Sequence, residues 1–323
     1  MSLANILPFE LLATLPHYLY SIEDLLSLSE TCRALYRACA DPAPNDVLRL
    51  AATSGRIFFR PHPHILIAFT ARQVADWAVQ HDDRRYLLEL AIQSGVDELL
   101  KLALRVAGLT MADIRRLCAY KCDVLNPLNR RLDLEAGPAS EDGWTICNDP
   151  ETTLLSWVIY GELFHHSLEL AYLPLPAHKP LSSITRYKWF VYCMPDENSF
   201  HYMKFSARWG DAGAPDFFQQ YVQAEDDRFQ QLSMHHAVEH MLNIYSWEEQ
   251  LQTTLAFQAL PLELCDPYIL AVMHMGLKSL EVLVGGPERM EADLNRVASG
   301  MAVLHDHTSL LEFIGKASRI INR

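Results

Sequence analysis

Among the residue types that can do chemistry, histidine is the one whose number and spacing in this chain most resemble those of a metal or acid–base site. The sequence holds 14 of them, and Glu162 and His165 stand three positions apart, which places both side chains on one face of a helix. Di-iron carboxylate bundles use two such Glu-x-x-His motifs together with two further carboxylates. Because no second Glu-x-x-His motif exists here, we expect no metal site at this one.

His236 and His240 are separated by one helical turn, as in zinc-binding helices. Glu239 adjoins the second histidine, so the order differs from the His-Glu-x-x-His motif of metalloproteases. Cys118 and Cys122 also have helical spacing but lack the second cysteine pair of a structural zinc site. The Gly-x-Ser-x-Gly elbow, the P-loop and Gly-x-Gly-x-x-Gly are absent as well. We therefore predict no metal, no cofactor and no catalytic residue.

Charge and cysteine content narrow the class of protein. The formal net charge is −13, and residues 136–323 hold 12 basic and 24 acidic side chains, which argues against nucleic-acid binding. No signal peptide and no run of ~20 apolar residues is recognisable, so we expect no membrane contact. Seven cysteines is an odd count, which favours reduced thiols and a cytoplasmic or nuclear protein.

The first forty residues have the pattern of two short amphipathic helices. The first begins at Pro8, whose missing N–H suits a helix start, and Glu10 in its first turn favours the helix dipole. Apolar residues then recur at four-residue spacing and form one stripe, which consists of Leu11, Leu15 and Leu19. Pro16 falls inside this helix and is expected to kink it.

The second helix begins after Ser21, a good N-cap residue, and carries Asp24 in its first turn. Its apolar positions recur at helical spacing and are Leu25, Leu28, Cys32 and Leu35. A module of this size cannot bury two such stripes alone, so it must pack on the rest of the chain or on a partner. An ordinary helical hairpin that caps a larger domain satisfies the same pattern.

The order of residue types over 6–40 resembles the F-box, in particular the form common in filamentous fungi. The resemblance rests on Leu7-Pro8-x-Glu10-Leu11-Leu12, then Leu15 and Tyr18-Leu19, then Asp24-Leu25-Leu26-x-Leu28-Ser29-x-Thr31-Cys32-Arg33. It implies an F-box over residues 1–42 that binds the small adaptor subunit of an SCF-type, cullin-based ubiquitin ligase. The adaptor-binding residues that it implies are Leu7, Pro8, Glu10, Leu11, Leu15, Leu19, Leu25, Leu28 and Cys32. Leu35-Tyr36 stands where the family has a bulky residue after the Cys-Arg pair.

Residues 43–323 are expected to form one mainly α-helical domain that follows a proline-rich linker, Asp41–Asn45. Apolar periodicity predicts its helices at Ala71–Gln80, Arg84–Gly95, Glu98–Ala107, Thr110–Tyr120, Pro215–Phe229 and Leu232–Ile244.

A weak repeating frame occurs in this domain. In each copy, one apolar residue lies seven positions before a glycine, and a second apolar residue lies four positions before it. The glycines are Gly55, Gly95, Gly161 and Gly276, and each is expected to end a helix with positive φ. The helix–Gly–helix unit around Gly95 resembles an ankyrin repeat, although the Thr-Pro-Leu-His signature is absent. A degenerate ankyrin-like stack and an unrelated α-helical fold both remain open.

One segment departs from the helical pattern. Thr185–Cys193 and Ser199–Arg208 are rich in aromatic and β-branched residues and flank a turn at 194–198, which predicts a β-hairpin over about 185–208. Its aromatics form a candidate client surface of Tyr187, Trp189, Tyr192 and Tyr202. The same side chains would serve equally to pack the hairpin onto the helices.

Two functions compete on these grounds. In the first, which the F-box resemblance implies, the chain is a non-enzymatic substrate receptor: residues 1–42 bind the adaptor subunit, and the helical domain binds an unknown protein client. In the second, the chain is a small-molecule or metal-binding protein or an enzyme, with a pocket lined by His165, His236 and His240. The N-terminal helices would then be purely structural.

Overall fold

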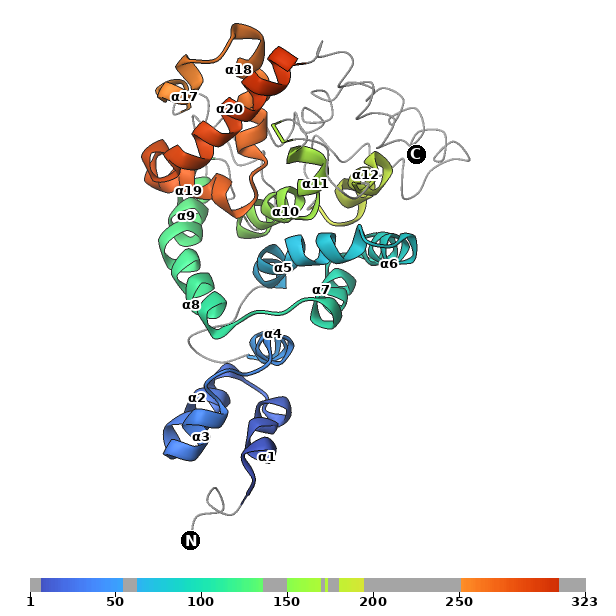
Figure 1. Ribbon diagram of the computed structural model, residues 1–323, viewed down its shortest axis with the longest axis vertical. Coiled ribbons are helices and arrows are strands. Elements are labelled where there is room, and N and C mark those ends of the chain that lie inside the picture. The colour runs from blue at the N-terminus through green and yellow to red at the C-terminus, as the bar shows by residue number, and fades with distance from the viewer. Residues whose placement is uncertain are drawn as a thin grey trace.

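The computed structural model describes residues 7–54, 63–135, 150–169, 172–173, 180–194 and 251–307. Every regular element in these ranges is a helix, which confirms the mainly α fold (Figure 1). The predicted helices Pro215–Phe229 and Leu232–Ile244 and the predicted strand Ser199–Arg208 lie outside the described residues.

The N-terminal module is built from short helices. Its elements are α1 (Phe9–Ala13), a 3₁₀ turn (Leu15–Tyr18), α2 (Ile22–Thr31) and α3 (Arg33–Ala38). Helix α1 ends before Pro16, and Ser21 caps α2 by accepting a hydrogen bond from the backbone N–H of Asp24 at 3.0 Å. The N-cap is confirmed, but the expected kink at Pro16 is instead a change from α1 to a 3₁₀ turn. The expected second helix is likewise interrupted at Cys32, which is extended between α2 and α3.

The central helices follow the predicted order closely. They are α4 (Pro44–Thr53), α5 (Pro63–Ala78), α6 (Asp82–Gln93), α7 (Val96–Val106), α8 (Met111–Tyr120), a π turn (Lys121–Leu125) and α9 (Asn126–Glu135). The remaining elements are α10 (Pro150–Leu163), α11 (His165–Leu168), α12 (Ser183–Tyr192), α17 (Leu255–Gln258), α18 (Leu262–Met273), α19 (Leu277–Gly285), a 3₁₀ turn (Pro287–Met290) and α20 (Glu291–His307).

The helices are arranged around α5, which packs between α7 and α10. All residues from His64 to Ala71 are buried, as expected of a helix that is apolar on every side. Helix α6 covers α12, and α17 to α20 form the end of the molecule opposite the N-terminal module (Figure 1). Within the described residues no single helix is long and apolar enough to cross a membrane; only α18 and α19 taken together pass that test, and they meet at 104°.

The three described glycines of the repeating frame have two different roles, and Gly55 lies outside the described residues. Gly95 and Gly276 have φ of 93° and 64° and precede α7 and α19, which confirms them as helix-ending residues. Gly161 instead lies inside α10, so the prediction of a helix end there is wrong. A Cβ on Gly161 would lie 2.7 Å from the backbone N of Gly276 and from the carbonyl of His274, so glycine is needed for this close approach. The ankyrin-like resemblance stays a prediction.

The first strand of the predicted β-hairpin is wrong, because Thr185–Cys193 falls almost entirely within helix α12. Ser182 caps this helix by accepting a hydrogen bond from the backbone N–H of Thr185 at 3.2 Å. Trp189 is fully buried, and α12 packs on α6. Burial of aromatic residues in a helix interface therefore overrides their preference for strands.

Helix α4 begins at Pro44, inside the predicted linker, and proline suits this first helical position. The carbonyl of Pro44 accepts a hydrogen bond from the N–H of Leu109 at 2.9 Å. The neighbouring Gly108 exchanges two backbone hydrogen bonds with the side-chain amide of Gln73 on α5. The first contact fixes α4 to the loop between α7 and α8, and the other two fix that loop to α5.

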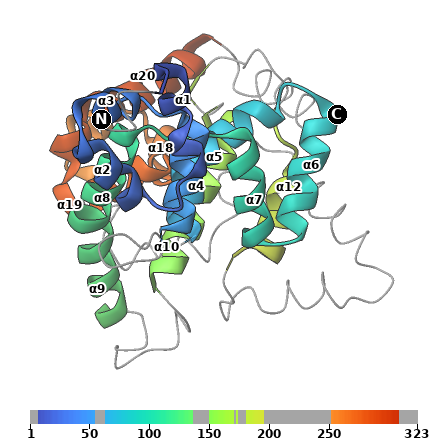
Figure 2. The same cartoon turned by 90° about the horizontal axis from the view of Figure 1, so that it is seen from below.

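Arg49 on α4 in turn holds the N-terminal module. Its guanidinium donates to the carbonyls of Leu19 at 2.9 Å, Pro16 at 3.1 Å and His17 at 2.8 Å. Near the end of α4, Thr53 donates to the carbonyl of Tyr20. Helix α4 therefore lies between the module and the rest of the protein (Figure 1), and the view from below shows the module in front of part of the helical domain (Figure 2).

We predict that Arg49→Met loosens this attachment, because three carbonyls lose a charged donor. Hydrogen bonds to charged groups are worth about 1.5–3 kcal/mol, so the free energy of local opening should fall by at least that amount. Hydrogen exchange should accelerate in α1 to α3 but not in α5. Arg37→Met, at an exposed position of α3, is the matched control; equal exchange in both variants would contradict the role of Arg49.

His274 is enclosed at the end of α18. Its ring lies 4.7 Å from that of Trp157, and its Nδ1 donates to the carbonyl of Leu270 at 2.6 Å. Burial, reinforced by the positive charge of Arg186, lowers the pKa of His274 to about 4, although the hydrogen bond to Leu270 opposes this shift. The folded protein therefore holds this imidazole neutral.

This lowered pKa predicts a loss of stability in mild acid. In the unfolded chain a histidine has a pKa of about 6.5, so between about pH 6.5 and 4 the unfolded state binds more protons and stability falls as pH falls. In His274→Gln, the dependence of the free energy of unfolding on pH should flatten over this window, whatever the stability of the variant. His81→Gln, at an exposed position, should keep the wild-type slope.

Candidate functional site

The N-terminal module has only a small apolar centre of its own. Leu12, Leu35 and Ala38 are buried together, with half-buried residues packed against them, namely Leu15, Leu28, Cys32 and Ala34. Leu25 is 2% exposed and belongs to the main core of the protein. The module is thus joined to the main core by α2, while α1 packs on α3 and the 3₁₀ turn.

The predicted adaptor-binding residues separate into two groups. Those at the start of the module are exposed and accessible to a partner: Leu7, Pro8, Glu10 and Leu11. The others are buried or half-buried and hold the module together: Leu15, Leu19, Leu25, Leu28 and Cys32. Pattern alone could not separate the groups, because both faces of these short helices carry apolar residues.

Several exposed residues of the module were missed by sequence reasoning. Phe9, Tyr18, Tyr20 and Tyr36 are exposed by between 55% and 78%, and they join the predicted Leu11, which is 54% exposed. The sequence signal that could have identified these exposed residues is the presence of large aromatic residues outside the predicted apolar stripes. Exposed aromatic and leucine side chains in one small module are typical of a protein-binding surface.

Of the four residues of the predicted client surface, the structure describes the side chains of Trp189 and Tyr192. Trp189 is 0% exposed and is therefore unavailable to a client, which corrects that prediction. Tyr192 is half-buried, and Tyr187 lies on α12. Tyr202 is outside the described residues.

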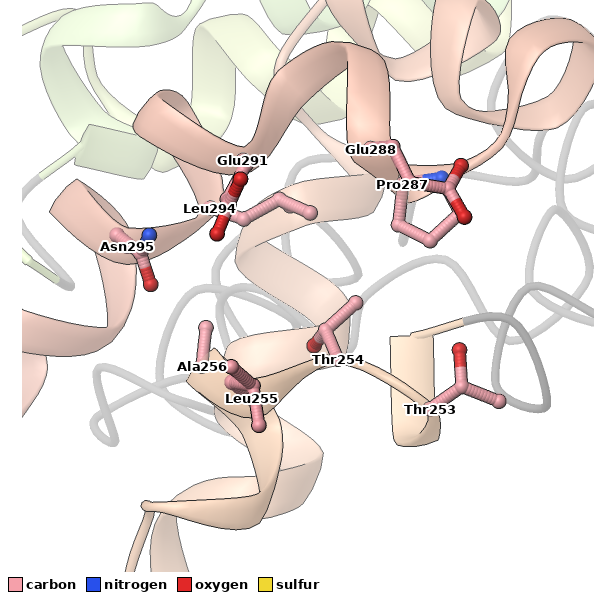
Figure 3. Close-up of a pocket in the computed structure, with 9 residues that line it drawn as sticks. All are labelled: Thr253, Thr254, Leu255, Ala256, Pro287, Glu288, Glu291, Leu294 and Asn295. Atoms are coloured by element: carbon pink, nitrogen blue, oxygen red, sulfur yellow. The ribbon is translucent and has the colours of Figure 1, made fainter.

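A pocket of about 190 Å³ lies between α17 on one side and the turn Pro287–Met290 with α20 on the other (Figure 3). Its lining combines hydroxyl, apolar and acidic side chains, from Thr253, Thr254, Leu255, Ala256, Pro287, Glu288, Glu291, Leu294 and Asn295. Among these, Leu255 is 76% exposed. The pocket can take a short polar or basic side chain with an apolar stem.

Glu162 connects three helices through one buried carboxylate. Its Oε2 accepts a hydrogen bond from Nε of Arg72 on α5 at 2.8 Å, and its Oε1 accepts from the backbone N–H of Leu277 at 3.0 Å. The second contact places a negative charge at the N-terminus of α19, which the helix dipole favours. A Cβ on Gly276 would come within 2.2 Å of Oε1, so this carboxylate also requires the glycine.

Arg72 is shared between two acids, since its Nη1 also lies 3.0 Å from Oε1 of Glu169. Burial lowers the pKa of Arg72, but the two carboxylates outweigh this effect and raise it. The three side chains line a polar cavity of about 320 Å³ together with Tyr172, Met275, Lys278 and Arg296. The charges in this cavity largely compensate one another, because Lys278 and Arg296 both pair with Asp293.

Two histidines of α11 meet one carboxylate of α5 nearby. Oδ1 of Asp76 lies 3.1 Å from Nε2 of His165 and 2.7 Å from Nε2 of His166. The hydrogen bond from His165 is the largest effect on the pKa of Asp76 and, against partial burial, lowers it. Burial and the neighbouring His165 lower the pKa of His166.

Asp76, His165 and His166 offer three ligand atoms that lie within 4.8 Å of one another. Glu162 and His165 have the spacing of a metal-binding pair, but the Glu162 carboxylate binds Arg72 and Leu277 instead. Sequence reasoning missed Asp76, which lies 90 positions before His166. His236 and His240, the other members of the predicted histidine pocket, lie outside the described residues.

Comparison of the chain with protein-family models, with curated proteins and with solved structures finds no match.

Proposed function

We propose that this protein is a substrate-recognition adaptor of an SCF-type ubiquitin ligase. In this role the module at residues 1–42 binds the small adaptor subunit, and the helical domain binds a protein client. The observation that carries the proposal is the exposure of apolar side chains at the start of the module, where Leu7, Phe9 and Leu11 are 39%, 55% and 54% exposed.

The attachment of the module supports this role. Arg49 binds backbone carbonyls of residues 16, 17 and 19, and Leu25 anchors α2 in the main core. These contacts leave the side chains of Leu7 and Leu11 out of the attachment. Burial of such leucines against a partner would contribute about 1.5–3 kcal/mol each.

We predict that the double variant Leu7→Ala, Leu11→Ala loses at least about tenfold in affinity for the SCF adaptor subunit, since truncation of a central apolar contact costs more than 1 kcal/mol. The measurement is co-purification of the intact chain with that subunit, followed by titration. The stability of the variant should stay close to that of the wild type, because both side chains are exposed.

Leu87→Ala with Leu90→Ala is the matched control, because these leucines of α6 are 47% and 39% exposed and lie outside the module. It should leave adaptor binding unchanged. Failure of the wild-type chain to bind the adaptor subunit, or equal binding by both double variants, would refute the proposal.

The pocket beside α17 is our proposed contact for the client. Glu288 and Glu291 line it, together with the exposed Leu255 (Figure 3). Carboxylates beside apolar surface suit the ammonium or guanidinium end and the methylene stem of Lys or Arg. The client segment that we propose is therefore a short basic peptide.

On an array of short peptides, the wild-type chain should prefer Lys- and Arg-containing sequences, and Glu288→Gln with Glu291→Gln should abolish that preference. Glu263→Gln with Asp266→Asn removes the same charge from α18 and should retain it, which separates local recognition from the net charge of the protein. Equal loss in both variants would exclude the pocket as the client site while leaving the adaptor contact untouched.

A further inference from the structure

We propose that Asp76, His165 and His166 form a binding site for a divalent transition-metal ion, with Zn²⁺ as the best match to its ligand set. Two imidazole nitrogens and one carboxylate oxygen would bind the ion, and a water molecule would complete four-coordination. This proposal rests on the geometry of the three side chains and is independent of the proposed ligase function.

The ligand atoms already converge. Both Nε2 atoms point to the same carboxylate oxygen of Asp76, at 3.1 Å from His165 and 2.7 Å from His166. In a tetrahedral site with zinc–ligand bonds of 2.0–2.1 Å, ligand atoms lie about 3.3 Å apart. To admit the ion, the distances from Asp76 to His165 and His166 would therefore lengthen by about 0.2 Å and about 0.6 Å.

The hydrogen bond on the far side of His165 fixes which nitrogen faces this point. Nδ1 lies 2.8 Å from the carbonyl of Glu162, and a carbonyl only accepts, so Nδ1 carries the proton. Nε2 donates to Asp76 when the ring carries a second proton, whereas in the neutral ring it presents a lone pair to the carboxylate oxygen. Two acceptors at this distance repel unless a cation or a further proton lies between them. Metal-binding histidines are commonly oriented in this way, by a backbone carbonyl on the other ring nitrogen.

The surroundings combine a rigid frame with one open side. His165 is 5% exposed, and its carbonyl partner Glu162 is anchored by Arg72 and α19. The side chain of Asp76 is 51% exposed, which leaves room for a water ligand. Arg72 lies one helical turn from Asp76, but its charge is compensated by Glu162 and Glu169. The positive charge next to the site is therefore largely neutralised.

The test is calorimetric titration of the EDTA-treated full chain with Zn²⁺ alone, paired with thermal unfolding. We expect one ion per chain, a dissociation constant in the micromolar range or below, and a melting temperature that rises with zinc concentration. Asp76→Asn and His166→Ala should each weaken binding at least tenfold. Absence of binding up to about 100 μM Zn²⁺ would overturn the proposal.

Two controls address other zinc ligands and folding. Cys118→Ser with Cys122→Ser removes the pair of thiols at helical spacing and should leave binding unchanged; loss of binding there, with Asp76→Asn unaffected, would overturn the proposal. Substitution with Co²⁺ gives a second readout on the wild-type chain, which does not depend on how the variants fold. Its spectrum should show nitrogen and oxygen ligation without a thiolate charge-transfer band, and a thiolate band would assign the ion to cysteine instead.

Discussion

The buried carboxylate of Glu162 is the interaction on which the centre of this protein depends. It joins α10 to α5 through Arg72 and to α19 through the backbone of Leu277. An uncompensated charge at this depth would cost several kcal/mol, so the folded protein needs both Arg72 and the N-terminus of α19 beside the carboxylate. Gly161 and Gly276 supply the close backbone approach that this arrangement needs.

The same residue links the core to the histidine cluster. Its side chain holds the helices, while its backbone carbonyl orients His165 toward Asp76. The packing of α5 against α10 therefore sets the geometry of the histidine cluster. Because neither ring can turn without loss of a contact, the three ligand atoms are positioned by the fold and not by a flexible loop.

Local signals allowed a large part of the helical fold to be predicted. Helices α6 to α8 have clear apolar periodicity and a glycine or a capping residue at their ends, and Ser21 caps α2 as expected. The aromatic run that became α12 was misassigned, because its preference for strands was outweighed by burial of Trp189. Gly161 was misassigned for a similar reason, since a long-range contact and not a helix end requires it.

The candidate sites were less predictable than the elements that carry them. The spacing of Glu162 and His165 predicted that both lie on one helix face, but Glu162 lies at the end of α10 and His165 begins α11, and their side chains contact different partners. Asp76 joins the histidines only through the packing of helices remote in sequence. In the N-terminal module, the pattern identified apolar residues but could not separate internal leucines from exposed ones.

The attachment of that module has an evolutionary consequence. Arg49 recognises carbonyl groups of residues 16, 17 and 19, and Thr53 recognises that of Tyr20. Every amino acid carries a backbone carbonyl, so these hydrogen bonds do not depend on side-chain type, although packing still constrains the buried Pro16 and the half-buried Leu19. The exposed rings of Tyr18 and Tyr20 can therefore diverge between related chains without detaching the module.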